Sequence, residues 1–367
     1  MKFNIVRLIL ALIFILPTVL QSQSFEKKRF ISKSFKVYDD MEVQLINKYG
    51  NIHMITWDKD SVKFEINMKV VSNKQSRLDG TFDFIEFKFT DTKYFVIAET
   101  VFQAEKNSFW EDVSDFANIL LKYNTSVQID YTLYIPSDND LKINNKFGNI
   151  YFSDFNGNLD VELSNGDIKA HNLDKAATIN LKFGNCKLNR INEGKIELSY
   201  SDFRTKTATN LKILSKSSTV SIDKINKIEI NSKRDKYYIG NANSIHGKAY
   251  FSYLNFDIFN ENVFLNTSYG DLTIENSNSL FDMFELNASY TDITLTIPKN
   301  IDCYFEYYFN EKTTFRLPHA FDSFEKVRIR GREDEDFLIK GNITEKDQAK
   351  SKIIIKQNSG FLLIQQN

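Results

Sequence analysis

Short runs of alternating polar and apolar residues follow one another through the middle of the chain, as in Lys195–Leu198 and Lys227–Ile230. Alternation over four or five residues predicts short strands with one buried face. Such short strands are not stable alone, so each must bury its apolar face against neighbours of the same kind.

A six-residue phrase recurs between these runs, and it ends in Asn or Asp followed by an apolar residue. Clear copies are Asn145–Ile150, Leu163–Ile168, Leu181–Cys186, Leu198–Phe203, Thr267–Leu272 and Ala288–Ile293, degenerate copies are Ser215–Val220 and Phe251–Phe256, and a separate copy is Asn47–Ile52. A period of about 18 residues is too short for a propeller blade and fits one coil of a parallel β-solenoid with about three short strands.

Matching residues of successive coils should stack along the solenoid axis at about 4.8 Å. The apolar ends of the phrases define the column Ile150, Ile168, Cys186, Phe203, Val220, Tyr237, Phe256, Leu272 and Ile293. The preceding positions define the column Asn149, Asp167, Asn185, Asp202, Thr219, Asn255, Asp271 and Asp292. This second column is interpreted as a ladder of turn residues, or as a row of calcium ligands. Half of its members are neutral, which favours the turn ladder.

Aromatic residues stand two positions before the Asn or Asp of most phrases: Tyr49, Phe147, Phe183, Tyr200, Tyr253, Tyr269 and Tyr290. Alternation along the strands points these rings toward the interior or a corner, where stacking would stabilise the column. If they face outward instead, they form a stripe that could stack on sugar rings. The candidate binding surface is then Tyr200, Tyr253, Tyr269 and Tyr290.

The chain on either side of the repeats has a different pattern. Longer alternating runs between Phe30 and Tyr134 predict ordinary antiparallel strands, and the capping-box pattern Ser108–Glu111 predicts a helix. Pro136 and Pro298 each follow a strand and bracket the regular coils. The final phrase, Asn358–Ile364, resembles another coil.

These observations predict an all-β fold, a single-chain parallel β-solenoid (β-helix) of about 18-residue coils capped by antiparallel β-strands and one short helix. The expected domains are a signal peptide at 1–24, an N-terminal β-rich cap at 25–135, the solenoid repeats at 136–298, and a C-terminal β-rich region at 299–367 that completes or caps the solenoid.

The first residues have the pattern of a secretory signal. Lys2 and Arg7 precede the apolar run Leu8–Leu16, and Ser22 and Ser24 have the spacing that a signal peptidase accepts. A retained membrane anchor is the alternative. No cysteine follows the run, so no lipid anchor is indicated, and no transmembrane segment is expected after cleavage.

Charge and chemistry exclude several function classes. Lys and Arg number 47 against 48 Asp and Glu, which argues against a nucleic-acid partner and against a polybasic membrane surface. Cys186 falls in the apolar column and is interpreted as a buried thiol, with a bridge to Cys303 as the alternative. The four histidines are scattered, and no nucleophile, phosphate-loop or dinucleotide motif occurs, so no catalytic residue, metal site or cofactor is expected.

A strand and proline followed by serial phrases such as Lys146-Phe147-Gly148-Asn149-Ile150 resembles bacterial exported "putative adhesin" families of unknown function, whose relatives include the head GIN domain. The likeness covers about Val127–Leu295. It implies a β-solenoid and a location in the periplasm or on the surface of a Gram-negative bacterium, and it supplies no catalytic residues.

The function that we expect is therefore a non-catalytic, adhesin-like protein of the cell envelope that presents a binding or scaffold surface. Its partner would be an envelope glycan, a protein or another copy of itself. A polysaccharide-processing β-helix enzyme is one alternative, although the paired carboxylates that this chemistry needs do not cluster in the sequence. A periplasmic envelope-stress accessory and a self-associating coat protein are the others.

Overall fold

The computed structural model describes residues 24–38, 41–103, 125–329, 336–343 and 349–367. The signal peptide and the helix expected near Ser108 lie outside these ranges. Contacts between residues divide the chain into two compact units. The first unit comprises Met1–Arg29, Met68–Glu86 and Phe102–Gln128, and the second comprises Phe30–Asn67, Phe87–Val101 and Ile129–Asn367.

The first unit contains the helix α2, Gln75–Asp83, which the sequence analysis did not anticipate. Its apolar side chains Leu78 and Phe82 are buried. Lys27 pairs with Asp79 at 3.1 Å, and the Lys27 ammonium also lies 4.4 Å from the centre of the Phe82 ring. The helix is thus fixed by a small apolar face and a rim of basic side chains.

The second unit consists of coils stacked through parallel pairing of strands. The strands of the N-terminal part of the chain are β1 (Phe25–Lys36), β2 (Glu42–Lys48), β3 (Ile52–Thr56), β4 (Ser61–Ser72), β5 (Ile85–Asp91), β6 (Phe95–Phe102) and β7 (Ser126–Ile135). Those of the regular coils are β8 (Asp140–Lys146), β9 (Ile150–Tyr151), β10 (Leu159–Ser164), β11 (Ile168–Lys169), β12 (Asn172–Lys182), β13 (Asn185–Ser199), β14 (Asp202–Lys216), β15 (Thr219–Lys233), β16 (Lys236–Tyr250), β17 (Tyr253–Ser277) and β18 (Met283–Ile297).

The remaining elements follow Pro298. They are β19 (Cys303–Phe309), β20 (Thr313–Arg316), the 3₁₀ turn η1 (His319–Phe321), β21 (Glu325–Arg328), β22 (Phe337–Asn342), β23 (Ser351–Asn358) and β24 (Gly360–Gln366). Strand β22 pairs antiparallel with β19 and with β21, so this end of the stack has an antiparallel cap, as expected.

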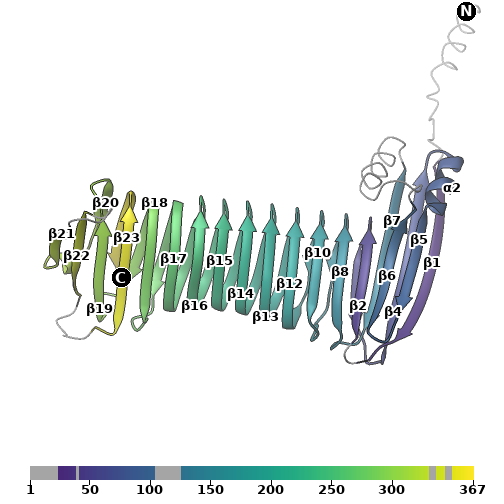
Figure 1. Ribbon diagram of the computed structural model, residues 1–367, viewed down its shortest axis with the longest axis horizontal. Helices are drawn as coiled ribbons and strands as arrows, with labels where there is room; N and C mark the ends of the chain where they lie inside the picture. The colour runs from purple at the N-terminus through teal and green to yellow at the C-terminus, as the bar shows by residue number, and fades with distance from the viewer. Residues whose placement is uncertain (1–23, 39–40, 104–124, 330–335, 344–348) are drawn as a thin grey trace, which may run out of the picture. The chain divides into compact units, whose positions relative to one another are not determined.

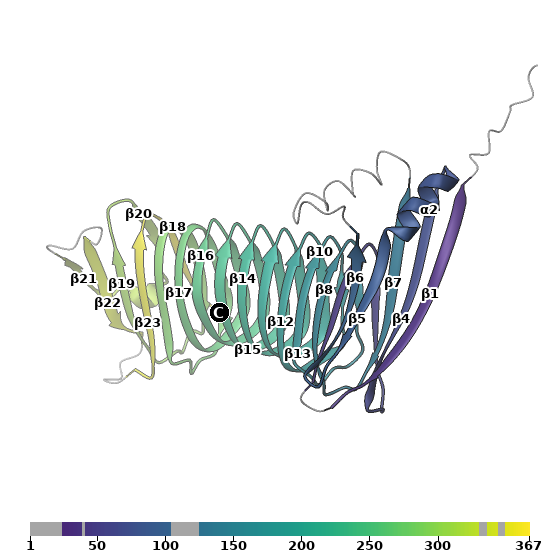
Figure 2. The same ribbon diagram turned by 45° about the vertical axis from the view of Figure 1, so that its right-hand side comes forward.

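The expected register is confirmed over most of the stack. Ile168 lies between Ile150 and Cys186, and Cys186 is followed by Phe203, Val220 and Tyr237 in successive coils. Figures 1 and 2 show strands β8 to β18 side by side in chain order. The column then continues through Leu254, not through Phe256.

The predicted register of this coil is therefore wrong by two residues, a shift that does not change which face of the strand a side chain occupies. Leu254 and Phe256 are both fully buried, so the alternation of burial is the same in either register. The coils in this part of the stack repeat after 17 residues, as in the bond from Asp235 to Ser252, and not after 18.

Both ends of the stack contain a coil that is out of chain order. Strand β2 pairs in parallel with β6 on one side and β8 on the other, and Ile52 of β3 is aligned with Ile150. The antiparallel strands expected here are therefore wrong for β2 and β3, and the phrase at Asn47–Ile52 belongs to the stack. At the other end, β23 lies between β18 and β19, with Leu362 of β24 beside Ile293 (Figure 1).

Side chains from all coils fill the interior of the stack. Large aromatic residues there are Tyr131, Phe155, Phe203, Tyr237, Phe256 and Tyr307, each less than 2% exposed. Cys186 and Cys303 are both free and buried, so the buried-thiol interpretation is confirmed and the bridge is wrong. Burial raises the pKa of both thiols, to about 12 for Cys303, which keeps them protonated and unreactive at neutral pH.

Candidate functional site

One residue in most of the described coils has a left-handed backbone conformation at the same corner of the stack. Eleven described residues other than glycine have positive φ, and we call this set the corner ladder: Tyr49, Phe147, Asn165, Phe183, Tyr200, Ser217, Arg234, Phe251, Tyr269, Tyr290 and Ser359. Their φ values lie between 50° and 69°. This conformation is costly for a bulky side chain, so only a corner that every coil must form accounts for its repetition.

The corner ladder carries most of the aromatic column of the sequence, but its rings are not buried. Phe183, Tyr200, Tyr269 and Tyr290 are each exposed to at least half of their full area. The expectation that these rings pack in the core is therefore wrong. The left-handed residue interrupts the extended backbone, so the inward–outward alternation that pointed Phe183 to the interior ends at the corner.

The exposed rings stack on one another along the axis. Phe183 and Tyr200 lie 5.3 Å apart with ring planes 4° from parallel, and Tyr269 and Tyr290 lie 4.9 Å apart at 2°. Phe251 stacks on Tyr269 at 4.9 Å, and Tyr49 stacks on Phe147 at 5.4 Å. The faces of the rings are consequently covered within each group, and only their edges and the terminal faces contact solvent.

Three of the four residues expected to form the binding surface belong to the corner ladder: Tyr200, Tyr269 and Tyr290. Tyr253 does not, because it is aligned with Lys236 and Phe251 occupies the ladder position of its coil. Tyr253 contacts the ring of Tyr238 instead, at 5.8 Å. The same two-residue slip that affected the apolar column misplaced Tyr253, and it also misplaced Asn255, which is aligned with Tyr238.

The Asn and Asp residues next to the corner connect adjacent coils. The backbone N–H of Asn149 donates to Asn51 Oδ1, that of Asp167 donates to Asn149 Oδ1, and that of Asn185 donates to Asp167 Oδ1, all between 2.8 and 2.9 Å. These bonds confirm the turn-ladder interpretation for these coils. Among the described residues, no group of three or more His, Cys, Asp or Glu side chains could hold a metal ion.

The bonding pattern changes at Asp202, where the coil length falls from 18 to 17 residues. The N–H of Asp202 donates to the Gly184 carbonyl, and the N–H of Thr219 donates to the Ser201 carbonyl. Neither the Asn185 amide oxygen nor the Asp202 carboxylate therefore accepts a backbone N–H from the next coil. The Asp202 carboxylate has no hydrogen bond or ion pair within the described ranges, and it points to solvent.

A hollow of about 510 Å³ runs along the corner at this change, and we call it the corner groove. Phe183 and Tyr200 line it together with Asp167, Asn185 and Asp202. Gly184 and Ser201 also line it, and Ser217 lines it in the next coil. Exposed aromatic rings and hydrogen-bond acceptors thus border the same hollow, and both recur from coil to coil along the solenoid axis.

Lysines precede several residues of the corner ladder and give this side of the corner positive charge. Lys48 lies beside Lys146, and its ammonium is 4.7 Å from the centre of the Tyr49 ring. Burial, and secondarily the charge of Lys146, lowers the pKa of Lys48 to about 8. Lys216 lies 6.0 Å from the centre of the Tyr200 ring.

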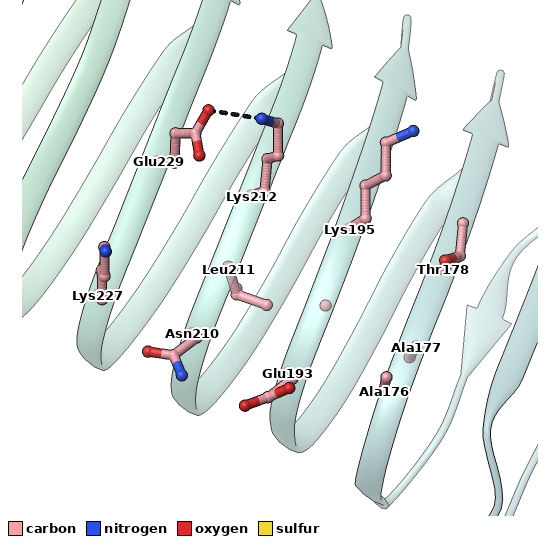
Figure 3. Close-up of a pocket in the computed structure, with 11 residues that line it drawn as sticks. Ala176, Ala177, Thr178, Glu193, Lys195, Asn210, Leu211, Lys212, Lys227 and Glu229 are labelled. Carbon is pink, nitrogen blue, oxygen red and sulfur yellow. Dashed lines mark hydrogen bonds and ion pairs between the residues drawn. The ribbon is translucent and has the colours of Figure 1, made fainter.

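A second hollow, of about 500 Å³, lies on a flat face of strands β12 to β15. Figure 3 shows its two outward rows, with Lys195, Lys212 and Glu229 in one and Glu193, Asn210 and Lys227 in the other. Lys212 pairs with Glu229 at 2.7 Å, and Lys195 pairs with Glu197 at 2.6 Å. Charges of both signs line this hollow, and Lys195 and Lys212 are each paired with a carboxylate, so its lining does not favour an ion of one sign.

The histidines have separate surroundings. His171 contacts Asp154 at 2.6 Å, His319 contacts Asp322 at 3.2 Å, and His53 and His246 stack on Tyr151 and Phe264. None of the described helices is long and apolar enough to cross a membrane.

Comparison with known proteins gives weak likenesses to solved structures. A putative cell adhesion protein from Clostridium sporogenes shares 10% identity over 93% of this chain and 100% of that chain, with a TM-score of 0.18. A putative adhesin from Bacteroides fragilis shares 8% over 92% and 98%, with a TM-score of 0.25, and one from Parabacteroides distasonis shares 11% over 74% and 90%, with a TM-score of 0.27.

The names of these proteins agree with the adhesin families that the repeat phrases of the sequence resemble. TM-scores of this size, however, establish neither a common fold nor a common function. No protein-family profile matches the sequence. No curated protein matches it either.

Proposed function

We propose that this chain is a non-catalytic, exported protein of the cell envelope, whose solenoid is a rigid support for a binding surface along the corner ladder. The observation that carries the proposal is the exposure of the ladder aromatics. Six of them are exposed between 45% and 57%: Phe147, Phe183, Tyr200, Phe251, Tyr269 and Tyr290. Exposed aromatic rows are unusual on proteins without a partner and are typical of recognition surfaces.

The geometry suits recognition because it is fixed before any partner arrives. The rings are held by the left-handed corner and by neighbouring rings, and the backbone N–H groups of Phe183, Tyr200 and Phe251 donate to carbonyls of the next coil. Binding to such a surface orders few side chains, so little conformational entropy opposes it. A partner with a linear repeat can then contact several coils at once.

We expect that replacing Phe183, Tyr200, Tyr269 and Tyr290 together with Asn abolishes binding of the full chain to isolated envelope polysaccharide, measured by retention on polysaccharide-coated beads. Asn is the matched substitution because Asn165 already occupies this conformation in the corner ladder. A control that replaces Tyr94 and Leu280, both exposed outside the ladder, with Asn should bind as the native chain does. Equal retention of the ladder variant and the control would contradict the proposed surface.

Export is a separate prediction that rests on the signal pattern of Met1–Ser24. A chain with a C-terminal tag should be recovered outside the cytoplasm, shortened by about the length of a signal peptide. Replacing Leu10 and Leu12 with Asp should leave the full-length chain in the cytoplasm, since the apolar run is what the export machinery recognises. A shortened, exported product from that variant would contradict the signal assignment.

A further inference from the structure

The interruptions of the corner ladder create places where a ring face is left uncovered. Tyr200 stacks on Phe183 on one side only, because the next ladder residue on its other side is Ser217. No other ring within the described residues contacts Tyr200. Its second face therefore has no ring on it and opens toward the end of the corner groove at Ser217, and the Lys216 ammonium of that next coil lies over it, 6.0 Å from the ring centre.

Hydrogen-bond acceptors line the groove near this ring. The carboxylate of Asp202, in the coil of Tyr200, has no partner among the described residues. One carboxylate oxygen of Asp167, two coils away on the Phe183 side, is likewise unused after Oδ1 accepts from Asn185. The change from 18-residue to 17-residue coils frees Asn185 and Asp202 from the backbone bonds that their counterparts make. The acceptors thus follow one another along the axis at about the strand spacing of 4.8 Å.

This combination matches the chemistry of a sugar. One face of a pyranose ring is a plane of C–H groups, which packs on an aromatic face, and its rim carries hydroxyl groups, which donate to carboxylate and amide oxygens. A peptide offers one N–H per residue, fewer donors than the several hydroxyl groups on the rim of one sugar. The carboxylates of Asp167 and Asp202 repel an anionic partner, whereas the Lys216 ammonium over the Tyr200 ring attracts one, so a charged sugar is compared with neutral ones in the test below.

Resting on the proposed function, we infer that the corner groove is a binding site for a neutral oligosaccharide, with one sugar ring stacked on the free face of Tyr200 above Ser217. Hydroxyl groups of this sugar and of its neighbours in the same chain donate hydrogens to Asp202 and Asn185.

The sharpest test fills the gap in the ladder. Ser217→Phe places a ring where most other coils already have one, so the corner can accommodate it, and the new ring covers the free face of Tyr200. Ser359→Phe is the matched control, since it extends the ladder at its other end, beyond Tyr290. The full chain is titrated by calorimetry with neutral hexasaccharides of glucose, mannose, galactose or N-acetylglucosamine, and with a galacturonic acid hexamer.

At least one neutral hexasaccharide should bind with a dissociation constant of about 1 mM or below, and Ser217→Phe should weaken that binding at least about tenfold. Tyr200→Ala should have a similar effect, Asp202→Asn a smaller one, and Tyr200→Phe and Ser359→Phe almost none. The inference is overturned if no neutral hexasaccharide binds, if the galacturonate binds more tightly, or if Ser217→Phe binds as the native chain does. Retention on envelope polysaccharide that needs the ladder but not Tyr200 and Asp202 would overturn this inference alone and leave the proposed function standing.

Discussion

Replacing Asp235 with alanine is expected to lower the free energy of unfolding by about 2–4 kcal/mol, a large effect for a single residue. Asp235 is 2% exposed and is the one charged side chain that is buried within the described part of the chain. It occupies the position after Arg234 of the corner ladder, where many other coils have glycine or serine. Its carboxylate is therefore held inside the corner and not in solvent.

Four donors satisfy this carboxylate. Oδ2 accepts hydrogen bonds from the hydroxyls of Ser215 and Ser232, both at 2.7 Å, and from the Lys233 N–H at 2.8 Å. Oδ1 accepts the Ser218 N–H at 2.8 Å, and thereby joins Asp235 to the preceding coil. The hydroxyls of Ser215 and Ser232 also contact the hydroxyls of Tyr237 and Ser252, so they would keep a partner in the alanine variant. The N–H groups of Ser218 and Lys233 would lose their acceptor, and each buried unsatisfied donor costs about 1–3 kcal/mol.

Asp235→Ser provides the matched control. In neighbouring coils Ser218 and Ser252 occupy the same position, and their hydroxyls accept the N–H of the preceding coil at 3.2 and 3.1 Å. Serine at 235 can make that bond, so its cost should be about half that of alanine. The measurements are urea unfolding and amide hydrogen exchange of β14 to β16, because stability in a repeat protein is partly local. An alanine variant as stable as the native chain would refute a stabilising role for the carboxylate.

The sequence predicted the fold well where one physical rule acts in every coil. The apolar column from Ile150 to Val220 and the Asn–Asp ladder from Asn149 to Asn185 both follow from stacking of equal repeats. The separate phrase Asn47–Ile52 carried the same signal, yet its place between β6 and β8 required a coil to be inserted out of chain order. Nothing local in the sequence encodes such an insertion.

The candidate site was predicted less well, for two physical reasons. The alternation of buried and exposed residues is the same after a shift of two residues, so it cannot distinguish Tyr253 from Phe251 as the ladder residue. Alternation also assumes extended backbone, whereas each ladder residue is left-handed, so the exposure of rings such as Phe183 was missed. The signal that could have found it is the small residue after each ring, which marks a tight corner.

That tight corner leads to the second large effect, a loss of about 1–3 kcal/mol of stability on replacing Gly148 with alanine. A Cβ added to Gly148 would lie 1.9 Å from the carbonyl oxygen of Gly50 in the adjacent coil and 2.4 Å from its carbonyl carbon. Both atoms are backbone, so no side-chain rotation can relieve the contact. The φ of Gly148 is not in the left-handed region, so the cost arises from the close approach of two coils and not from backbone strain.

Coils with a side chain at this position, such as that of Ser201, show that the corner has an arrangement that admits a Cβ. To admit a Cβ at Gly148, its corner would have to shift toward that arrangement while the adjacent corners at Gly50 and Gly166 keep the glycine arrangement. This shift is the source of the expected loss of stability.

Gly80→Ala in α2 is the opposite case, because a Cβ there meets no atom within 4 Å. It should stabilise the chain by about 0.5–1 kcal/mol, through the helix preference and lower unfolded-state entropy of alanine. Thermal and urea unfolding of both variants test the difference in sign, and a Gly148→Ala chain as stable as the native one would show that the coils are not packed against each other at this corner.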